Sequence, residues 1–132
     1  MKKLLESLEQ KIVSSYEEGV TVDQAEKLAG EFLYGQVKVS QALKDADLDS
    51  RMKKSGVKAI RAAIYMAEAT KSEKKPTEAM LAALIDSNDL VMSEQNSLDQ
   101  SEVSRDELER YYNIFNNAHI HFRGIAKGSF GG

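Results

Sequence analysis

Hydrophobic residues recur at spacings of three and four along most of the chain, which is the pattern of amphipathic helices. One such run covers residues 2–18 and is followed by Gly19, a residue type that commonly ends helices in a left-handed conformation. A second run starts after Thr21 and Gln24, which have the spacing of a capping box, and continues to about residue 45. The pattern therefore predicts two helices in the first third of the chain.

The stretch 45–50 interrupts this pattern, because it alternates aspartates with small residues that favour turns and caps over helix interiors. We expect a break or a bend there, and Ser50 is a candidate cap for the helix that follows. In residues 51–72, Val57, Ile60, Ile64 and Ala67 repeat with 3-4-3 spacing, the seam of a helix packed on another helix. A charged connector before Pro76 ends this predicted helix.

The last third of the chain contains two further helix starts. Thr77 precedes an apolar helical face, and the polar residues 86–89 either end that helix or interrupt it. Residues 93–103 are nearly all polar, so they are expected to be a mobile loop or a solvated helix. Ser104 and Glu107 then form a capping box inside a hydrophobic staple of Val103 with Leu108, which predicts a final helix that ends at Gly124.

These elements predict an all-α fold of about five helices, arranged as an antiparallel helical hairpin or bundle with a long C-terminal helix. No segment shows convincing strand alternation. With 132 residues the chain has the length of one domain, expected at residues 1–124 and followed by a flexible glycine-rich tail at 125–132.

Composition narrows the cellular setting. The chain has no Cys, which excludes disulfides and thiolate metal sites and fits a reducing cytoplasm. Its first residues resemble a signal peptide, but Glu6, Glu9 and Lys11 interrupt the apolar region that export requires. We therefore expect a cytoplasmic protein that is not embedded in a membrane.

The charges are segregated along the sequence. Residues 51–75 carry eight basic and two acidic side chains, whereas residues 1–50 carry six and ten and residues 76–110 carry two and nine. Local fields govern anion binding more than the net charge of -3 does. The basic block is therefore the strongest functional signal in the sequence.

On a helix, Arg51, Lys54, Lys58 and Arg61 fall within an arc of roughly 80°, on one flank of the predicted packing seam. Lys53 adds to the positive field near the start of the same helix. Like charges three and four residues apart repel one another, so their clustering favours an anionic partner such as phosphate. Three interpretations stay open: nucleic-acid binding, ion pairing within or between protomers, and binding of another anion.

Single-stranded nucleic acid is normally bound by cations together with aromatic stacking platforms. Tyr65 is one candidate platform, and others lie near the C-terminus beside Arg123 and Lys127. Tyr111, Tyr112, Phe115 and Phe122 have the spacing of core residues, which leaves Phe130 as the freest of the C-terminal aromatics. The predicted DNA-binding residues are Arg51, Lys53, Lys54, Lys58, Arg61, Tyr65, Arg123 and Lys127.

The sequence contains little catalytic or metal-binding chemistry. His119 and His121 point roughly 160° apart on a helix, and no Cys or nearby carboxylate completes a metal site. The acidic residues are scattered along helical faces without a nucleophile or a phosphate-binding glycine loop. We therefore expect no metal, no cofactor and no enzyme activity.

Three segments resemble the UvsY recombination mediators of T4-type bacteriophages. Residues 57–65 (Val-Lys-Ala-Ile-Arg-Ala-Ala-Ile-Tyr) are similar to the basic helical segment of that family, residues 86–90 to its acidic turn between helices, and residues 122–125 to its C-terminal Arg-Gly-aromatic ending. The three segments occur in the family's order and span residues 25–126 together with the intervening helices. Lys58 and Arg61 match the family's DNA-contacting positions.

This resemblance implies a phage protein that acts in the infected bacterial cell as a homo-oligomer. It would bind single-stranded DNA, help displace the single-strand binding protein and load a RecA-like recombinase. The last helix, with its aromatic seam, is expected to form much of the protomer interface. Two alternatives remain: a phage-encoded adaptor or inhibitor that binds a host protein, and a structural phage assembly protein.

Overall fold

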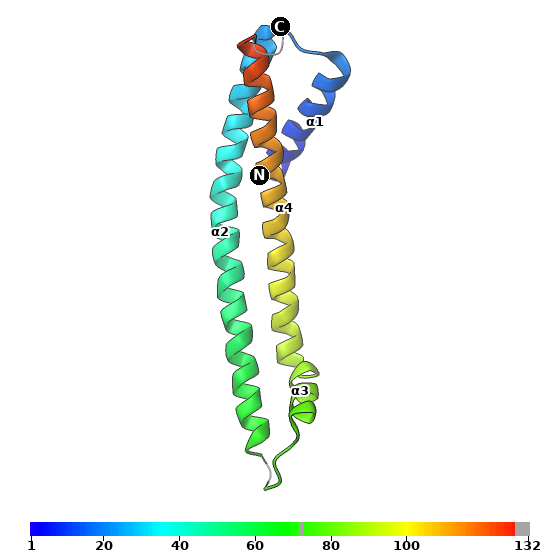
Figure 1. Cartoon of the computed structure of the whole chain (residues 1–132), viewed down its shortest axis with the longest axis vertical. Helices are drawn as coiled ribbons and strands as arrows, with labels where there is room; N and C mark the ends of the chain where they lie inside the picture. The colour runs from blue at the N-terminus through cyan, green and yellow to red at the C-terminus, as the bar shows by residue number, and fades with distance from the viewer. Residues whose placement is uncertain (72, 129–132) are drawn as a thin grey trace. The chain divides into compact units, whose positions relative to one another are not determined.

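The computed structural model describes residues 1–71 and 73–128, and all regular structure in these residues is helical (Figure 1). The helices are α1 (Lys2–Glu18), α2 (Val22–Ala69), α3 (Glu78–Asp86) and α4 (Asp89–Ala126). The predicted all-α fold with a long C-terminal helix is confirmed, with four helices in the described residues instead of about five. The chain divides into two compact units, and both α2 and α4 contribute residues to each of them.

Unit 1 contains Met1–Lys44 and the chain from Asp106 onward, so it combines α1 with one part of α2 and one part of α4. α1 ends where predicted, because Gly19 has a φ of 75° and its N–H donates to the Ser15 carbonyl at 2.9 Å. The predicted capping box is also present: Gln24 N–H donates to Thr21 Oγ1 at 3.2 Å, and Thr21 N–H donates to Gln24 Oε1 at 2.9 Å. Local sequence signals therefore define both ends of the α1–α2 connection.

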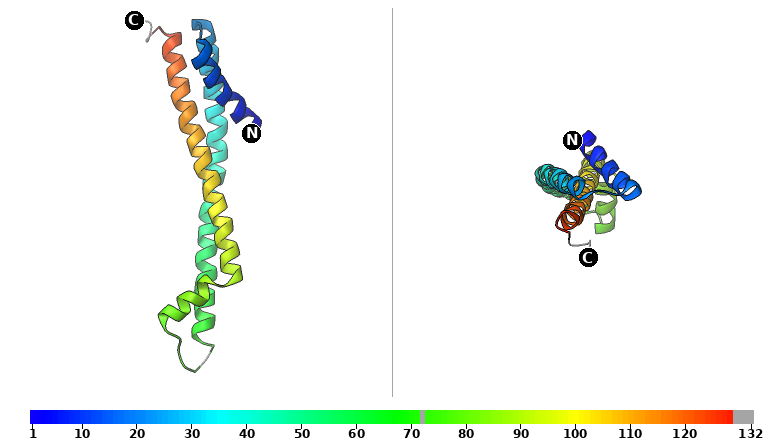
Figure 2. Two further views of the ribbon diagram at one scale, coloured as in Figure 1. Left: turned by 90° about the vertical axis from the view of Figure 1, so that its right-hand side faces the viewer. Right: turned by 90° about the horizontal axis from the view of Figure 1, so that it is seen from above.

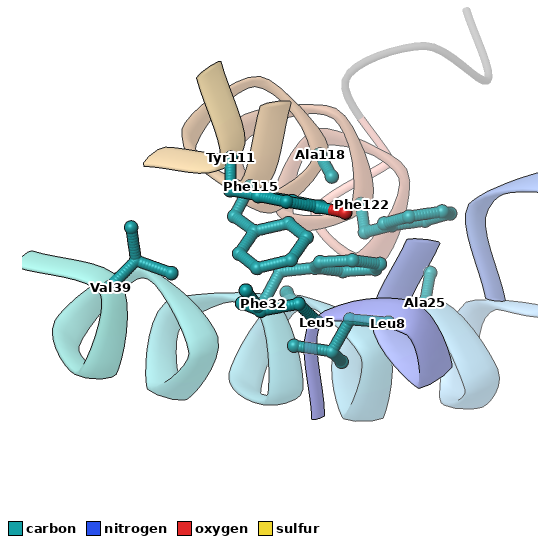
Figure 3. Close-up of a cluster of buried hydrophobic side chains, with 10 residues drawn as sticks. Leu5, Leu8, Ala25, Phe32, Val39, Tyr111, Phe115, Ala118 and Phe122 are labelled. Carbon is teal, nitrogen blue, oxygen red and sulfur yellow. The ribbon is translucent and has the colours of Figure 1, made fainter. Parts of the chain in front are cut away.

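The core of unit 1 is aromatic. Phe32 of α2 and Phe115 of α4 are completely buried, with ring centroids 5.7 Å apart, and Phe32 stacks on Phe122 at 5.6 Å (Figure 3). Leu5 and Leu8 close this cluster from α1. The prediction that Tyr111, Phe115 and Phe122 are core residues is confirmed, whereas Tyr112 is only partly buried. The role of the last helix in a protomer interface stays a prediction.

α2 and α4 run antiparallel in unit 1. Ala29 of α2 is bonded to His119 of α4, and Gln36 of α2 is bonded to Asn116 of α4. Residue numbers therefore fall along α4 as they rise along α2. Gly35 lies at a close contact of this packing, because a Cβ atom there would overlap Leu8 Cδ1 and lie 3.3 Å from Phe115. The close approach of the three helices therefore depends on a residue without a side chain.

Unit 2 comprises Asp45–Arg105 and contains the second part of α2, all of α3 and the first part of α4. Within it, α3 lies beside the C-terminal end of α2 (Figure 2). The predicted helix start at Thr77 is confirmed, since Thr77 Oγ1 accepts from Met80 N–H at 3.2 Å. Asn88 caps α4 by accepting from Leu90 and Val91 N–H, so residues 86–89 end one helix and begin another.

The predicted break at residues 45–50 is wrong, because α2 continues through this stretch. Asp47 pairs with Arg51 and Asp49 with Lys53, each across one helical turn at 3.1 Å. Ser50 does not cap a helix: it is buried and bonded to Ser101 of α4. Favourable i,i+4 pairs and tertiary packing thus override the weak local helix preference of the aspartates.

The predicted start of a helix at Ser104 is also wrong, because residues 93–103 are helical and α4 has begun at Asp89. The staple residue Val103 is 67% exposed, and Leu98 is the buried apolar residue of this stretch. Gly124 does not end the helix, which continues to Ala126. The first two residues of the expected tail are therefore helical, and residues 129–132, including Phe130, lie outside the described residues.

The predicted seam of residues 57–67 is confirmed only in part. Val57 is buried and Ile60 and Ile64 are half-buried, but Ala67 is exposed. The half-buried positions of α2 continue to Glu68 and Ala69, so the packed face reaches the end of the helix one position away from the predicted Ala67.

Candidate nucleic-acid interface

Four cations lie along one flank of α2 within unit 2, and we call them the basic flank: Arg51, Lys54, Lys58 and Arg61. Buried Val57 and Ser50 fix the rotation of the helix, since they face the core of the unit. At about 100° per residue, Lys58 and Arg51 then lie roughly 100–120° from the buried direction, and Arg61 and Lys54 roughly 40–60°. The first two therefore point to solvent, and the other two lie near the edge of the packed face.

Two members of the basic flank pair with carboxylates of their own unit. Arg51 lies 3.1 Å from Asp47 and Arg61 lies 2.7 Å from Asp86 of α3. Both pairs are open to solvent, and exposed pairs of this kind contribute about 0–1 kcal/mol. They reduce the positive field of the flank without fixing the guanidinium groups firmly to their partners.

Lys54 and Lys58 differ from the two arginines. Both are exposed, and neither makes an ion pair with any residue that the structure describes. They lie four residues apart, which puts their side chains one above the other on the helix surface. Their positive charge is the part of the basic flank that the fold leaves uncompensated.

Lys53 does not belong to this flank. It lies roughly 140° around the helix from Lys58 and pairs with Asp49. Ser101 donates to the same carboxylate at 2.7 Å, and this bond, followed by Lys53, lowers the pKa of Asp49. Because the single hydroxyl proton of Ser101 is used in this bond, Ser50 must donate to Ser101 across 3.0 Å. Lys53 therefore completes a polar cluster that links α2 to α4.

Tyr65 extends the line of the basic flank by one turn beyond Arg61. It is half-buried, and its hydroxyl donates to Glu78 Oε1 at 3.0 Å, which raises the pKa of Tyr65. Arg61 and Tyr65 thus bond to acidic residues near opposite ends of α3, Asp86 and Glu78. The sequence suggested two DNA contacts here, and the structure gives both residues a role in holding α3 against α2.

The other predicted contacts lie in unit 1. Arg123 is exposed in the last turn of α4, and Lys127 is exposed beyond its end. Neither shares a unit with the basic flank. The described structure therefore brings together four of the predicted cations, with Tyr65 beside them. Lys53 lies on another face of α2, and Arg123 and Lys127 belong to unit 1.

No cluster of three or more potential metal-ligating side chains occurs in residues 1–71 and 73–128. His119 is engaged within unit 1: its Nδ1 lies 2.9 Å from the Ala29 carbonyl oxygen, which can only accept, so the proton is on Nδ1. An open groove of about 690 Å³ in the same unit is lined mainly by apolar residues of α1 and α4, with Tyr16 and His121 at its wall. None of its lining residues belongs to the basic flank.

Within the described chain, no helix is both long enough and apolar enough to cross a bilayer. No protein-family model, curated protein or solved structure matches this chain. The assignment of function therefore rests on the geometry of the chain itself.

One surface was missed by reasoning from sequence. Leu48, Met52 and Met66 of α2 are each about 60% exposed, on the side of the helix opposite Val57. The signal was present in the sequence, because these residues belong to a second series with spacings of three and four. The expected break at residues 45–50 separated Leu48 from the other residues of the series.

Proposed function

We propose that this protein binds single-stranded DNA through the basic flank of α2 and catalyses no reaction itself. The observation that carries the proposal is the pair of exposed lysines, Lys54 and Lys58, whose charges are not compensated by carboxylates of the described chain. Such cations can replace the counterions that surround phosphates, and this exchange drives most sequence-independent binding to nucleic acids. Two lysines one turn apart repel each other, and this repulsion lowers the stability of the helix slightly. An anionic ligand between them would remove the repulsion.

The arginines at the two ends of the flank support the same function. Arg51 has a side chain that is 78% exposed, so phosphate can compete with Asp47 for its guanidinium at little cost. Arg61 lies nearer the packed face, where it pairs with Asp86, and would add a further positive charge to the same line. Four cations then follow one side of the helix over about three turns.

The resemblance to the UvsY mediators supports a narrower form of this proposal. The protein would act in the cytoplasm of a phage-infected bacterium, where it would help displace the single-strand binding protein and load a RecA-like recombinase. Assembly into a homo-oligomer would combine several modest phosphate contacts into tight binding. The interface between protomers would then lie outside the aromatic core of unit 1.

A second candidate function is that of a helical adaptor or inhibitor that binds another protein. The exposed apolar side chains of Leu48, Met52 and Met66 favour it, because regularly spaced apolar residues on a helix surface commonly mark a protein contact. The two candidate functions differ in one expected result: the first predicts that the protein binds DNA in the absence of any other protein, and the second does not.

The test uses a fluorescent oligo-dT and measures its anisotropy as the purified protein is added at low salt. Substitution of Lys54→Ala together with Lys58→Ala is expected to weaken binding about tenfold while leaving the helical circular dichroism unchanged. Lys2→Ala with Lys3→Ala is the matched control, since these are two exposed lysines of α1 in unit 1. Absence of binding by the unaltered protein, or equal affinity in the two double variants, would overturn the proposal.

A further inference from the structure

α2 carries a second apolar face within unit 2, which we call the outer face. Leu48, Met52 and Met66 are 59%, 66% and 61% exposed. The complete series has spacings of 4-3-4-3-4 and consists of Leu48, Met52, Ser55, Ala59, Ala62 and Met66, all exposed. Alternation of three and four is the seam of a helix that packs on another helix.

The outer face lies opposite the face that packs in unit 2. Leu48 and Met66 are about 180° around the helix from buried Val57, and neither belongs to the buried residues of the unit. Single exposed apolar residues are common on protein surfaces, but five of these six positions in heptad register are apolar, and Ser55 is the one polar residue among them. The outer face therefore has the spacing of a packing surface and no partner in the described chain.

Charges along the two edges of the outer face indicate what it would bind. Arg51 and Lys58 directly precede the seam residues Met52 and Ala59, so they occupy the flanking positions of one edge. Asp49 is on the other edge, where Lys53 and Ser101 already bond to it. Arg51 also pairs with Asp47, so Lys58 is the uncompensated charge of the basic edge, whereas the carboxylate of the other edge is paired with Lys53.

A second copy of this chain is a poor match for this charge pattern. Antiparallel pairing about the middle of the seam would bring Lys58 next to Lys58 of the second copy, and like charges in flanking positions disfavour assembly. A helix with carboxylates along one flank would instead meet Arg51 and Lys58 with opposite charges. The small residues Ser55, Ala59 and Ala62 leave room for large apolar side chains of such a helix.

We propose that the outer face of α2 binds an amphipathic helix of a partner protein, one with a large apolar seam and an acidic flank. The apolar seam would provide most of the binding energy, and the basic edge would fix the orientation of the helix and select for acidic partners. This site lies beside the proposed DNA-binding flank and shares Arg51 and Lys58 with it, but its seam residues are not needed for phosphate contacts.

The probe is a fluorescein-labelled peptide of three heptads with Leu at both seam positions and Glu at both flanking positions. Repulsion between its own glutamates keeps this peptide from pairing with itself at neutral pH. The comparison peptide has the same leucines and Lys at the flanking positions. The full-length protein is expected to bind the Glu peptide at least about tenfold more tightly than the Lys peptide, by fluorescence anisotropy.

The matched variants change the seam without changing charge. Leu48→Gln, Met52→Gln and Met66→Gln in one chain are expected to abolish peptide binding and to preserve oligo-dT binding. Val103→Gln is the control, because Val103 is similarly exposed but lies on α4 of the same unit. Failure of the proposed DNA-binding function would leave these peptide results unchanged, so the two proposals can fail separately.

Three results would overturn the proposal. One is the absence of binding by the Glu peptide, and another is equal affinity for both peptides, which would remove the role of the basic edge. The third is a concentration-dependent dimer in sedimentation experiments that the triple Gln substitution dissolves, since this would assign the outer face to a second copy of the chain.

Discussion

The two units are built from the same two long helices but differ in how completely they bury their apolar residues. Unit 1 packs a third helix, α1, over the pair and encloses a continuous aromatic cluster around Phe32 and Phe115. Unit 2 has α3, a helix of nine residues, in the corresponding role, and its core is made of scattered aliphatic residues together with buried Ser50 and Ser101. Unit 1 thus has the larger buried core, although both units expose large apolar side chains. Unit 2 differs in also carrying Lys54 and Lys58, whose charges no carboxylate of the described chain compensates.

The largest effect is expected from the aromatic core of unit 1. Phe115→Ala removes a completely buried ring and should lower the free energy of unfolding by about 3–5 kcal/mol. Leu98→Ala in unit 2 is the comparison and should cost about 2–4 kcal/mol, because Leu98 is a smaller buried side chain that lies outside the aromatic cluster. Urea denaturation followed by circular dichroism measures both, and an equal or larger loss for Leu98→Ala would contradict the comparison.

The next effect concerns the close helix packing of unit 1. Gly35→Ala places a Cβ against Leu8 and Phe115, so the overpacked core should lose about 1–3 kcal/mol of stability. Gly30→Ala is the matched control on the same helix, since no atom lies within 4 Å of its added Cβ, and it should gain about 0.5–1 kcal/mol. Stabilisation by both substitutions would show that the helices do not approach as closely as described.

A smaller effect is expected from the polar cluster of unit 2. Ser101→Ala removes the hydrogen bond with buried Ser50, which should cost about 1 kcal/mol, and also removes the bond to Asp49. The pKa of Asp49 is lowered in the folded state, so its contribution to stability is present above the ordinary carboxyl pKa and is lost as pH falls through the lowered value.

Denaturation of both proteins at pH 7 and at pH 3 tests this dependence. The loss caused by Ser101→Ala should be larger at pH 7, where Asp49 is ionised in the folded protein. A difference between the two proteins that does not change with pH would contradict the assigned role of Asp49.

The smallest effect is expected on the outer face of α2. Met66→Gln should change the free energy of unfolding by less than about 0.5 kcal/mol, because the side chain is mostly exposed and Gln favours helix nearly as well as Met. Leu81→Gln in α3 is the contrast, since Leu81 is 1% exposed and its replacement buries an amide. A large loss for Met66→Gln in thermal denaturation would show that the outer face is already covered.

Helix boundaries were predicted well where a cap acts locally and poorly where tertiary packing decides. Gly19, Thr21 and Thr77 end or begin helices as expected, because each does so through its own conformation or a bond to a residue a few positions away. Ser104 has an equally good capping pattern, but Asn88 had already begun the helix and the chain passes through Ser104 without a break.

The candidate site was predicted in outline. Spacing alone placed the four cations of the basic flank on one side of a helix. The carboxylates that pair with Arg51 and Arg61 could not be assigned in the same way, since Asp47 lay in the expected break and Asp86 comes from a separate helix. Burial of Ser50 and exposure of Leu48 likewise depended on the continuity of α2, which local propensity did not favour.

The most direct test of the central claim is the salt dependence of oligo-dT binding by the unaltered protein and by the Lys54→Ala, Lys58→Ala variant. Each phosphate contact on a single strand contributes a log–log slope of about -0.7, so removal of two contacts should make the slope shallower by about 1.4. A slope that stays the same in the folded double variant would contradict DNA binding through the basic flank of α2.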